Sequence, residues 1–207
     1  MSEDIWPTVH RERAALAADL AGLAETQWST PSLCAGWTVR DVLAHMSATA
    51  AMTPVGFLAG FARSGFRFAR VSEAGIAGAL GDSPAETLRT FNSRVNASTS
   101  PPGPKVSWLG EAIIHSEDIR RPLGLTHEHS PDVLTKVADF YRDSNLLIGA
   151  KKRIEGLRLD ATDSSFGTGE GPSVRGPVLA LLMAMTGRGV FCDDLEGAGV
   201  ETLRSRC

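Results

Sequence analysis

The sequence has few cysteines and no long apolar run. Its 207 residues include three cysteines, Cys34, Cys192 and Cys207, which are scattered and odd in number. This distribution argues against a disulfide framework and against the paired Cys-x-x-Cys spacing of structural zinc sites. The longest apolar run, residues 178–185, is too short to span a membrane, and the polar N-terminus lacks the apolar core of a signal peptide. We therefore expect a reduced, cytoplasmic protein without a membrane partner.

Positive charge is also scarce. With 21 Lys and Arg against 24 Asp and Glu, the formal net charge is -3, and no basic block stands out. This argues against a nucleic-acid partner. The densest positive cluster is Arg63, Arg67 and Arg70, but phenylalanines are threaded through it. Such a mixture is more typical of a pocket rim or a solvated helix face than of a phosphate-binding track.

One segment, residues 108–119, combines apolar residues with groups that could carry chemistry. Read as a helix, it places Glu111 and His115 four residues apart on one face. Trp108 and Ile119 share the same rhythm, so this face is expected to turn inward. Because unpaired burial of a carboxylate or an imidazole is costly, a divalent metal is one possible partner. The alternative is a satisfied core histidine beside a solvated Glu/His pair.

His45 is the predicted third ligand. It lies on a second helix with an apolar stripe, one turn after Thr38 and Asp41, whose spacing predicts a capping box. Two histidines and one glutamate would leave a zinc ion one open coordination position, which is typical of catalytic zinc sites.

Two further side chains lie near these segments. Asp118, one turn beyond His115, could orient that imidazole, or it could form a helix-surface salt bridge with Arg120 or Arg121. Cys34 precedes the second helix, whose N-terminus could lower the pKa of the thiol.

The chain as a whole predicts an α+β protein that is mainly α. Helical spacing and capping residues predict helices over residues 3–24, 38–50, 83–96, 108–122 and 130–148. Glycines interrupt residues 54–81, which we expect to be an irregular or short-helical lid. The later pattern predicts strands over 157–161 and 172–175, turns over 163–165 and 167–171, a buried helix over 176–185, a last strand from Phe191, and a closing turn around Leu203.

The expected domains are a helical bundle over residues 1–150 and a small α/β subdomain over residues 151–207. The second part is too short to bury an independent core, so we expect it to dock against the bundle. A pocket is expected at the seam between them.

Residues 33–45 and 110–124 together resemble the actinobacterial maleylpyruvate isomerase family of mycothiol-dependent enzymes. Further matches at 156–159, 169–172 and 187–188 extend the resemblance over nearly the whole chain. The resemblance implies a DinB-like four-helix bundle with a small sterol-carrier-protein-like C-terminal part. It also implies that His45, Glu111 and His115 hold a zinc ion, that mycothiol is the thiol cosubstrate, and that Cys34 is a packed small hydrophobe.

The chemistry implied by this resemblance is thiol activation. A free thiol has a pKa near ~8.5, and binding to Zn²⁺ deprotonates it. The thiolate could then attack an electrophilic small molecule, in cis-trans isomerisation or in S-transfer. The alternatives are a zinc hydrolase that uses metal-bound water and a non-catalytic metal or small-molecule binding module. We expect a monomer, and the sequence does not identify the electrophile.

A substrate that carries a carboxylate would need a cation to bind it. Arginine suits this role because its guanidinium offers bidentate geometry. Arg188 matches a Gly-Arg pattern of the family and is the predicted catalytic arginine, with Arg175 as the other candidate for substrate binding. The alternative is that Arg188 pairs with Asp193, Asp194 or Glu196 to hold the tail.

Overall fold

The computed structural model describes residues 4–145 and 148–207, and its contacts divide the chain into two compact units. The first unit extends to Thr126 and the second begins at His127. The division falls earlier than the expected boundary after residue 150, because helix α7 (Pro131–Arg142) packs against α9 (Val178–Met185) of the second unit. That each unit is a separate domain stays a prediction.

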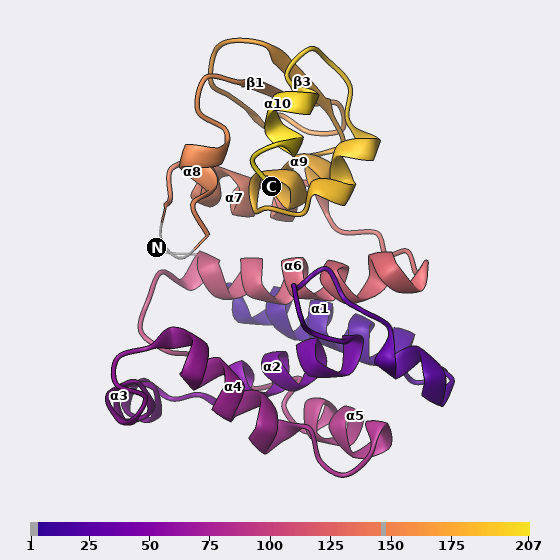
Figure 1. The fold of residues 1–207 in the computed structure, drawn as a ribbon, viewed down its shortest axis with the longest axis vertical. Coiled ribbons are helices and arrows are strands. Elements are labelled where there is room, and N and C mark those ends of the chain that lie inside the picture. The colour runs from indigo at the N-terminus through magenta and orange to yellow at the C-terminus, as the bar shows by residue number, and fades with distance from the viewer. Residues whose placement is uncertain (1–3, 146–147) are drawn as a thin grey trace. The chain divides into compact units, whose positions relative to one another are not determined.

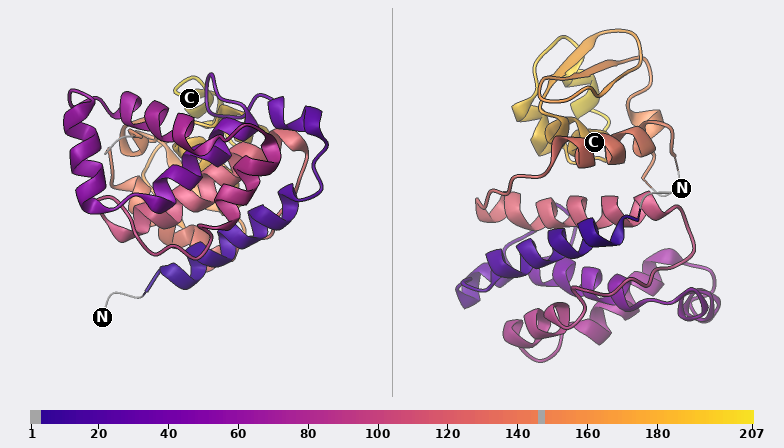
Figure 2. Two further views of the ribbon diagram at one scale, coloured as in Figure 1. Left: turned by 90° about the horizontal axis from the view of Figure 1, so that it is seen from below. Right: turned by 180° about the vertical axis from the view of Figure 1, so that it is seen from behind.

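The first unit is helical (Figure 1). In chain order its elements are α1 (Trp6–Leu20), the 3₁₀ helix η1 (Glu25–Ser29), α2 (Val39–Ala51), α3 (Pro54–Arg63), α4 (Phe68–Ala79), α5 (Pro84–Asn92) and α6 (Lys105–Leu123). Helices α1, α2, α5 and α6 pack on one another, and Figure 2 shows α1 running alongside α6. Their apolar stripes meet in a core that includes Leu16, Leu43, Phe91 and Ile119, all fully buried. This confirms the predicted helical bundle.

Local capping fixes several helix ends where the sequence predicts them. The Thr38 hydroxyl accepts a hydrogen bond from the Asp41 amide at 3.2 Å, and the Asp41 carboxylate accepts one from the Thr38 amide at 2.9 Å. Ser83 caps α5 in the same way, accepting from the Glu86 amide at 3.3 Å. Gly124 ends α6 with φ 68°, a left-handed conformation that glycine adopts without strain. Helices α1 and α5 are shorter than expected, since α1 ends at Leu20 and α5 at Asn92.

Residues 54–81 contain two short helices, which is one of the two expected alternatives. They form α3 and α4, and the Thr53 hydroxyl caps α3 by accepting from the Gly56 amide at 3.0 Å. Gly56, Gly60, Gly75 and Gly78 lie inside these helices, whereas Gly65, with φ 62°, lies in the turn between them. A Cβ at Gly75 would lie 3.0 Å from the Ala48 Cβ, so glycine allows α4 to approach α2 closely.

The second unit combines helices with a small sheet. Its elements are α7, α8 (Ala150–Arg153), β1 (Arg158–Ala161), β2 (Gly167–Thr168), β3 (Ser173–Gly176), α9, the 3₁₀ helix η2 (Gly189–Asp194) and α10 (Val200–Arg204). The sheet has the order β2-β1-β3, with β1 antiparallel to β2 and parallel to β3. Helix α9 packs against α7 and against both β1 and β3.

Several expectations for the second unit are wrong. Gly167 and Thr168 pair with β1 instead of lying only in a turn. Phe191 does not begin a strand, because it lies in η2 and is buried as η2 packs against α9. Leu203 is a buried residue of α10 and not part of a turn. Helix α7 ends at Arg142, earlier than the expected end at 148, and residues 146 and 147 of the expected helix lie outside the described residues.

Among the described residues, no single helix combines the length and the apolar character needed to cross a membrane. Helices α2 and α3 together have the required length and composition, but they are bent by 120° relative to each other.

Candidate functional site

His115 is held by a buried carboxylate. Helix α6 places Asp118 three residues beyond it, and its Oδ2 lies 2.9 Å from His115 Nδ1. The Asp118 side chain is fully buried, whereas that of His115 is 19% exposed. Arg120, one alternative partner for Asp118, instead binds Asp19 at 2.7 Å and Glu117 at 3.3 Å. The structure therefore places Asp118 where it can orient the His115 ring.

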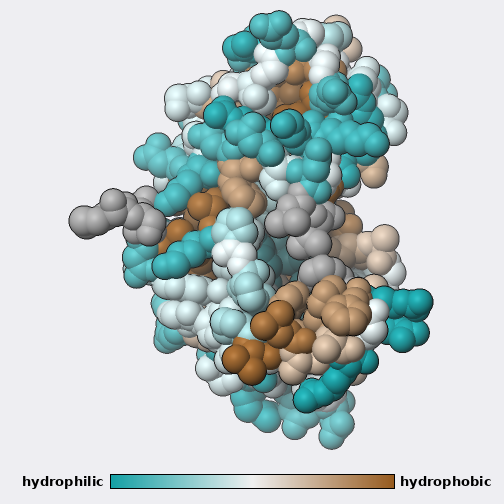
Figure 3. All heavy atoms as spheres, turned by 90° about the vertical axis from the view of Figure 1, so that its left-hand side faces the viewer, coloured by the Kyte–Doolittle hydropathy of each residue, from teal (hydrophilic) through white to brown (hydrophobic). Residues whose placement is uncertain are grey.

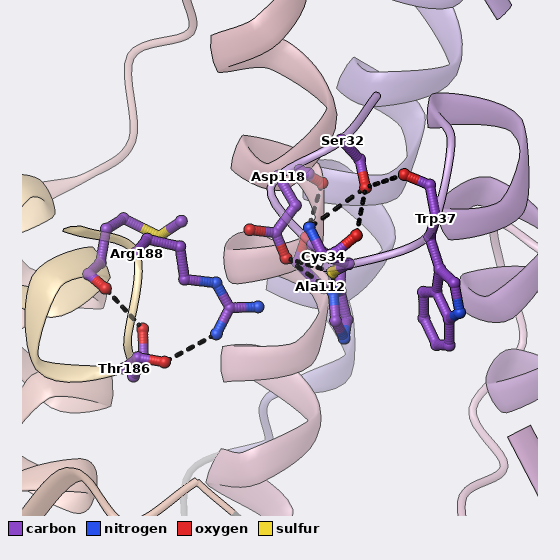
Figure 4. A network of polar contacts seen from close by, with 10 residues as sticks. Ser32, Cys34, Trp37, Ala112, Asp118, Thr186 and Arg188 are labelled. Carbon is purple, nitrogen blue, oxygen red and sulfur yellow. Dashed lines mark hydrogen bonds and ion pairs between the residues drawn. The ribbon is translucent and has the colours of Figure 1, made fainter. Parts of the chain in front are cut away.

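The loop before α2 brings a thiol to the same point. The Cys34 Sγ lies 3.1 Å from Asp118 Oδ2 and 3.6 Å from His115 Nδ1 (Figure 4). Two backbone contacts hold the loop: the Leu33 amide donates to the Asp118 carbonyl at 3.1 Å, and the Cys34 amide donates to the Ser32 hydroxyl at 3.1 Å. Cys34 also packs against the bundle core, but it is more than the packed hydrophobe that we expected.

The pKa of His115 is raised in this arrangement. Burial disfavours its charged form, but the hydrogen bonds with Asp118 and Cys34, together with their charges, raise its pKa to about 10. Without a bound cation, His115 and Asp118 therefore form a charged pair at neutral pH.

His45 reaches the other histidine from α2. The ring centroids of His45 and His115 lie 5.0 Å apart, with the planes at 78°. His45 also contacts Trp37, at 5.1 Å between ring centroids. Burial, and next the charge of His115, lower the pKa of His45 to about 3. His45 is therefore neutral and keeps a nitrogen lone pair for a ligand.

Glu111 lies one turn before His115 and has unmet hydrogen-bonding capacity. Both of its carboxylate oxygens are buried, and no described residue donates a hydrogen bond to either. Burial raises the pKa of Glu111, while the positive charges of Arg13 and His115 oppose this rise. The indole Nε1 of Trp108, one turn earlier, is also buried without a partner among the described residues. Buried polar groups are rarely left in this state, so the site is suited to a ligand.

Arg13 is a residue of this site that the sequence analysis did not identify. It lies on α1, is 1% exposed, and donates from Nη1 to the Ala97 carbonyl at 3.0 Å. Burial lowers its pKa, and the negative charge of Glu111 opposes this effect. The available signal was its position at helical spacing between Val9 and Leu16, where an apolar residue is expected.

His115 belongs to two possible sets of metal ligands. The predicted set, His45, Glu111 and His115, offers two imidazoles and a carboxylate. The two buried oxygens of Glu111 accept no hydrogen bond from the described residues, so a cation would stabilise them. These donor types fit zinc. Among the described residues, the set around His115 whose ligand atoms all lie within 4.8 Å of one another is instead Cys34, His115 and Asp118. The predicted set thus fits in its chemistry, and the second set is the more closely spaced.

The two predicted arginines lie in the second unit. Arg188 follows α9, and its Nη1 donates to the Thr186 carbonyl at 2.8 Å (Figure 4). Arg175, on β3, has a half-exposed side chain and pairs with Glu196 at 3.8 Å. Asp193, one of the alternative partners of Arg188, pairs with Arg204 at 2.9 Å. Arg175 thus has a structural partner, and the roles of both arginines in substrate binding stay predictions.

Comparison with known proteins identifies the family of the first unit. The family model described as the mycothiol maleylpyruvate isomerase N-terminal domain matches residues 9–120, more than half of the chain. A search of curated proteins found no match.

Two solved structures share the fold. A crystal structure of the mycothiol-dependent maleylpyruvate isomerase has a TM-score of 0.58 and 15% sequence identity, and the match covers 93% of this chain and 91% of that chain. A histidine-to-alanine mutant of the enzyme gives a TM-score of 0.57 with the same identity and coverage. The matched residues 9–120 include Cys34, His45, Glu111, His115 and Asp118, and this chain belongs to the mycothiol maleylpyruvate isomerase family.

Proposed function

We propose that this enzyme binds zinc through His45, Glu111 and His115 and uses mycothiol as a thiol cosubstrate against an electrophilic small molecule. The observation that carries the proposal is the pair of buried carboxylate oxygens of Glu111, which accept no hydrogen bond from the described residues and lie one turn from His115. The family assignment supports mycothiol as the thiol. Zinc at such a site lowers the pKa of a bound thiol, which makes the thiol nucleophilic at neutral pH.

The residues of the chain prepare this site in distinct ways. Burial keeps His45 neutral, so it can bind without losing a proton. Asp118 engages Nδ1 of His115, which leaves Nε2 as the nitrogen for a ligand and fixes the ring. His115 must release the proton that its raised pKa holds, so metal binding is expected to release a proton.

The proposed reaction is addition followed by elimination. The thiolate sulfur forms a bond to one carbon of a conjugated double bond, and the electron pair of that bond moves toward the conjugated carbonyl. The former double bond rotates as a single bond. The electron pair then returns and expels the thiolate, so the product is the trans isomer and the thiol is regenerated. In S-transfer, protonation of the adduct leads to its release instead.

Arg188 is the proposed cation for a substrate carboxylate, with Arg175 as the second candidate. The fork of a guanidinium binds a carboxylate through two hydrogen bonds, which a lysine cannot do. We expect Arg188→Lys to lose most of the turnover while zinc content and thiol binding are retained. Normal turnover in this variant would assign the carboxylate to Arg175.

Titration of mycothiol into the metal-loaded and the metal-free protein tests the proposed function. We expect saturable binding that needs the metal and is lost, together with the metal, in His115→Ala. The matched control is His10→Ala, on α1, which contacts the Ala97 carbonyl. Equal and near-stoichiometric zinc in His115→Ala and the wild type would contradict the ligand assignment.

The same titration separates the two alternatives. Metal-dependent hydrolysis of esters or amides without a thiol would identify a hydrolase. Metal binding with neither thiol binding nor turnover would identify a non-catalytic module. A cytoplasmic location, an actinobacterial origin, a monomeric state and the absence of a nucleic-acid partner stay predictions.

A further inference from the structure

Helix α3 carries apolar side chains on the outside of the first unit. None of its residues is buried. Val55 is 77% exposed and Leu58 59% exposed, and together with the exposed Ala62 they are spaced by three and four residues, which places them on one helix face. Phe66, in the loop that follows, is 72% exposed. Figure 3 shows apolar residues gathered on the side of the molecule where α3 lies in Figure 1.

Packing holds Phe66 outside. The ring of Phe61 stacks on that of Phe57 at 5.7 Å and meets that of Phe66 edge-on at 5.4 Å, which fixes the loop against α3. Phe66 has φ 60°, a left-handed conformation that is unusual for a bulky residue. The chain thus holds an exposed aromatic side chain in an unfavourable backbone conformation.

A positive cluster accompanies these apolar side chains. Arg63 is the last residue of α3, Arg67 precedes α4 and Arg70 lies in the first turn of α4, and all three are exposed. Between Asp41 and Glu73 the sequence has no acidic residue, although the whole chain has a net charge of -3. The positive charge of this segment is therefore locally uncompensated in sequence, and it favours an anionic partner.

We propose that the surface formed by α3, the loop after it and the start of α4, with Val55, Leu58, Ala62, Phe66, Arg63, Arg67 and Arg70, docks on a bilayer that contains anionic phospholipids. Arginines attract lipid phosphates, while apolar and aromatic side chains enter the boundary between headgroups and acyl chains. The combination of both kinds of side chain on one short segment fits an interface better than it fits a pocket rim. The contact is peripheral and reversible, because α3 has only 10 residues. It departs from our expectation that the protein has no membrane partner.

Cosedimentation of the full chain with two kinds of vesicle tests this proposal. We expect binding to phosphatidylcholine vesicles that contain phosphatidylglycerol and little binding to phosphatidylcholine alone, with the binding weakened by salt. Each arginine near an anionic surface contributes about fivefold to the affinity, so replacing Arg63, Arg67 and Arg70 together by glutamine should weaken binding by roughly 100-fold. The matched control replaces Arg11, Arg89 and Lys105, which are three exposed cations elsewhere in the first unit.

The apolar half of the surface is tested separately. Leu58→Gln removes an exposed apolar side chain without lowering helix propensity, and we expect weaker vesicle binding with an unchanged melting temperature. No binding to anionic vesicles, equal binding to both kinds of vesicle, or an equal loss in the control variant would overturn the proposal. Dimerisation in solution that Leu58→Gln abolishes would identify a second copy of the chain as the occupant and would likewise overturn it.

Discussion

Helices α6 and α9 are both interior helices, but they bury different chemistry. Helix α9 buries Leu181, Leu182 and Met183 among other apolar residues, and none of its residues is charged. Helix α6 buries Asp118 and Arg120 alongside its apolar positions. Burial of charge is costly unless each group is paired, so α6 depends on partners that α9 does not need. The comparison separates a helix that stabilises the fold from one that carries a site.

Removing a side chain from α9 should give the largest loss of stability. Leu182 is fully buried, and Leu182→Ala removes apolar contacts and leaves a cavity. We expect the second unit to lose about 3 kcal/mol of unfolding free energy. Denaturant titration measures this loss, and the zinc content of the first unit should not change. A loss of zinc in this variant would contradict the separate roles of the two helices, because α9 would then support the metal site as well.

Replacing Glu111 of α6 should raise the stability of the metal-free protein, in contrast to Leu182→Ala on α9. Its raised pKa means that the metal-free fold is most stable when Glu111 is protonated, and that stability falls as the pH rises above the ordinary value of 4.5. Glu111→Gln removes the buried charge. We therefore expect the metal-free variant to be more stable than the wild type at neutral pH, by about 1–3 kcal/mol, because a neutral amide costs less to bury than a carboxylate whose pKa burial raises.

Bound zinc should reverse the order of stability of the wild type and Glu111→Gln. We expect zinc to stabilise the wild type and to have little effect on Glu111→Gln, as measured by thermal unfolding with and without zinc. The control is Glu25→Gln, because Glu25 is exposed on η1. If Glu111→Gln destabilises the metal-free protein, a partner of Glu111 other than a ligand is indicated.

Asp118 should contribute a smaller amount of stability to the metal-free fold, and this contribution should depend on pH. The pKa of His115 is raised from 6.5 to about 10, so the His115–Asp118 pair stabilises the metal-free fold fully below pH 6.5 and loses this contribution as the pH rises through about 10. Asp118→Asn should therefore cost about 1–2 kcal/mol at pH 6 and progressively less toward pH 10. Titration of the His115 ring by NMR should show a pKa well below 10 in the variant. A cost that does not change with pH would indicate a packing role for Asp118.

The comparison also shows which features could be predicted from the sequence. The ends of α2 and α6 were predictable because Thr38, Asp41 and Gly124 act through local hydrogen bonds and backbone conformation. The apolar character of α9 was equally evident. Arg13 was missed because burial beside Glu111 depends on a contact between residues far apart in sequence.

The helices α3 and α4 were less predictable for a related reason. In the sequence, a glycine inside a helix cannot be told from a glycine that ends one. The structure shows that Gly75 allows α4 to approach Ala48 of α2 closely. The prediction of a strand from Phe191 was wrong because it used only the local preference of an aromatic residue for a strand. Packing of η2 against α9 outweighs this preference.

The smallest effect is expected at Cys34, and it separates the two possible ligand sets. In Cys34→Ser the hydroxyl can still donate to Asp118, as the thiol does at 3.1 Å, so we expect a stability change below ~1 kcal/mol. If His45, Glu111 and His115 hold the metal, the zinc affinity of this variant should also stay close to that of the wild type. Cys34→Ala, which removes the donor, should lower the stability slightly more. If Cys34→Ser loses its zinc while His45→Ala retains it, the metal belongs to Cys34, His115 and Asp118, and α6 would then use its buried carboxylate as a ligand and not as a support for His115.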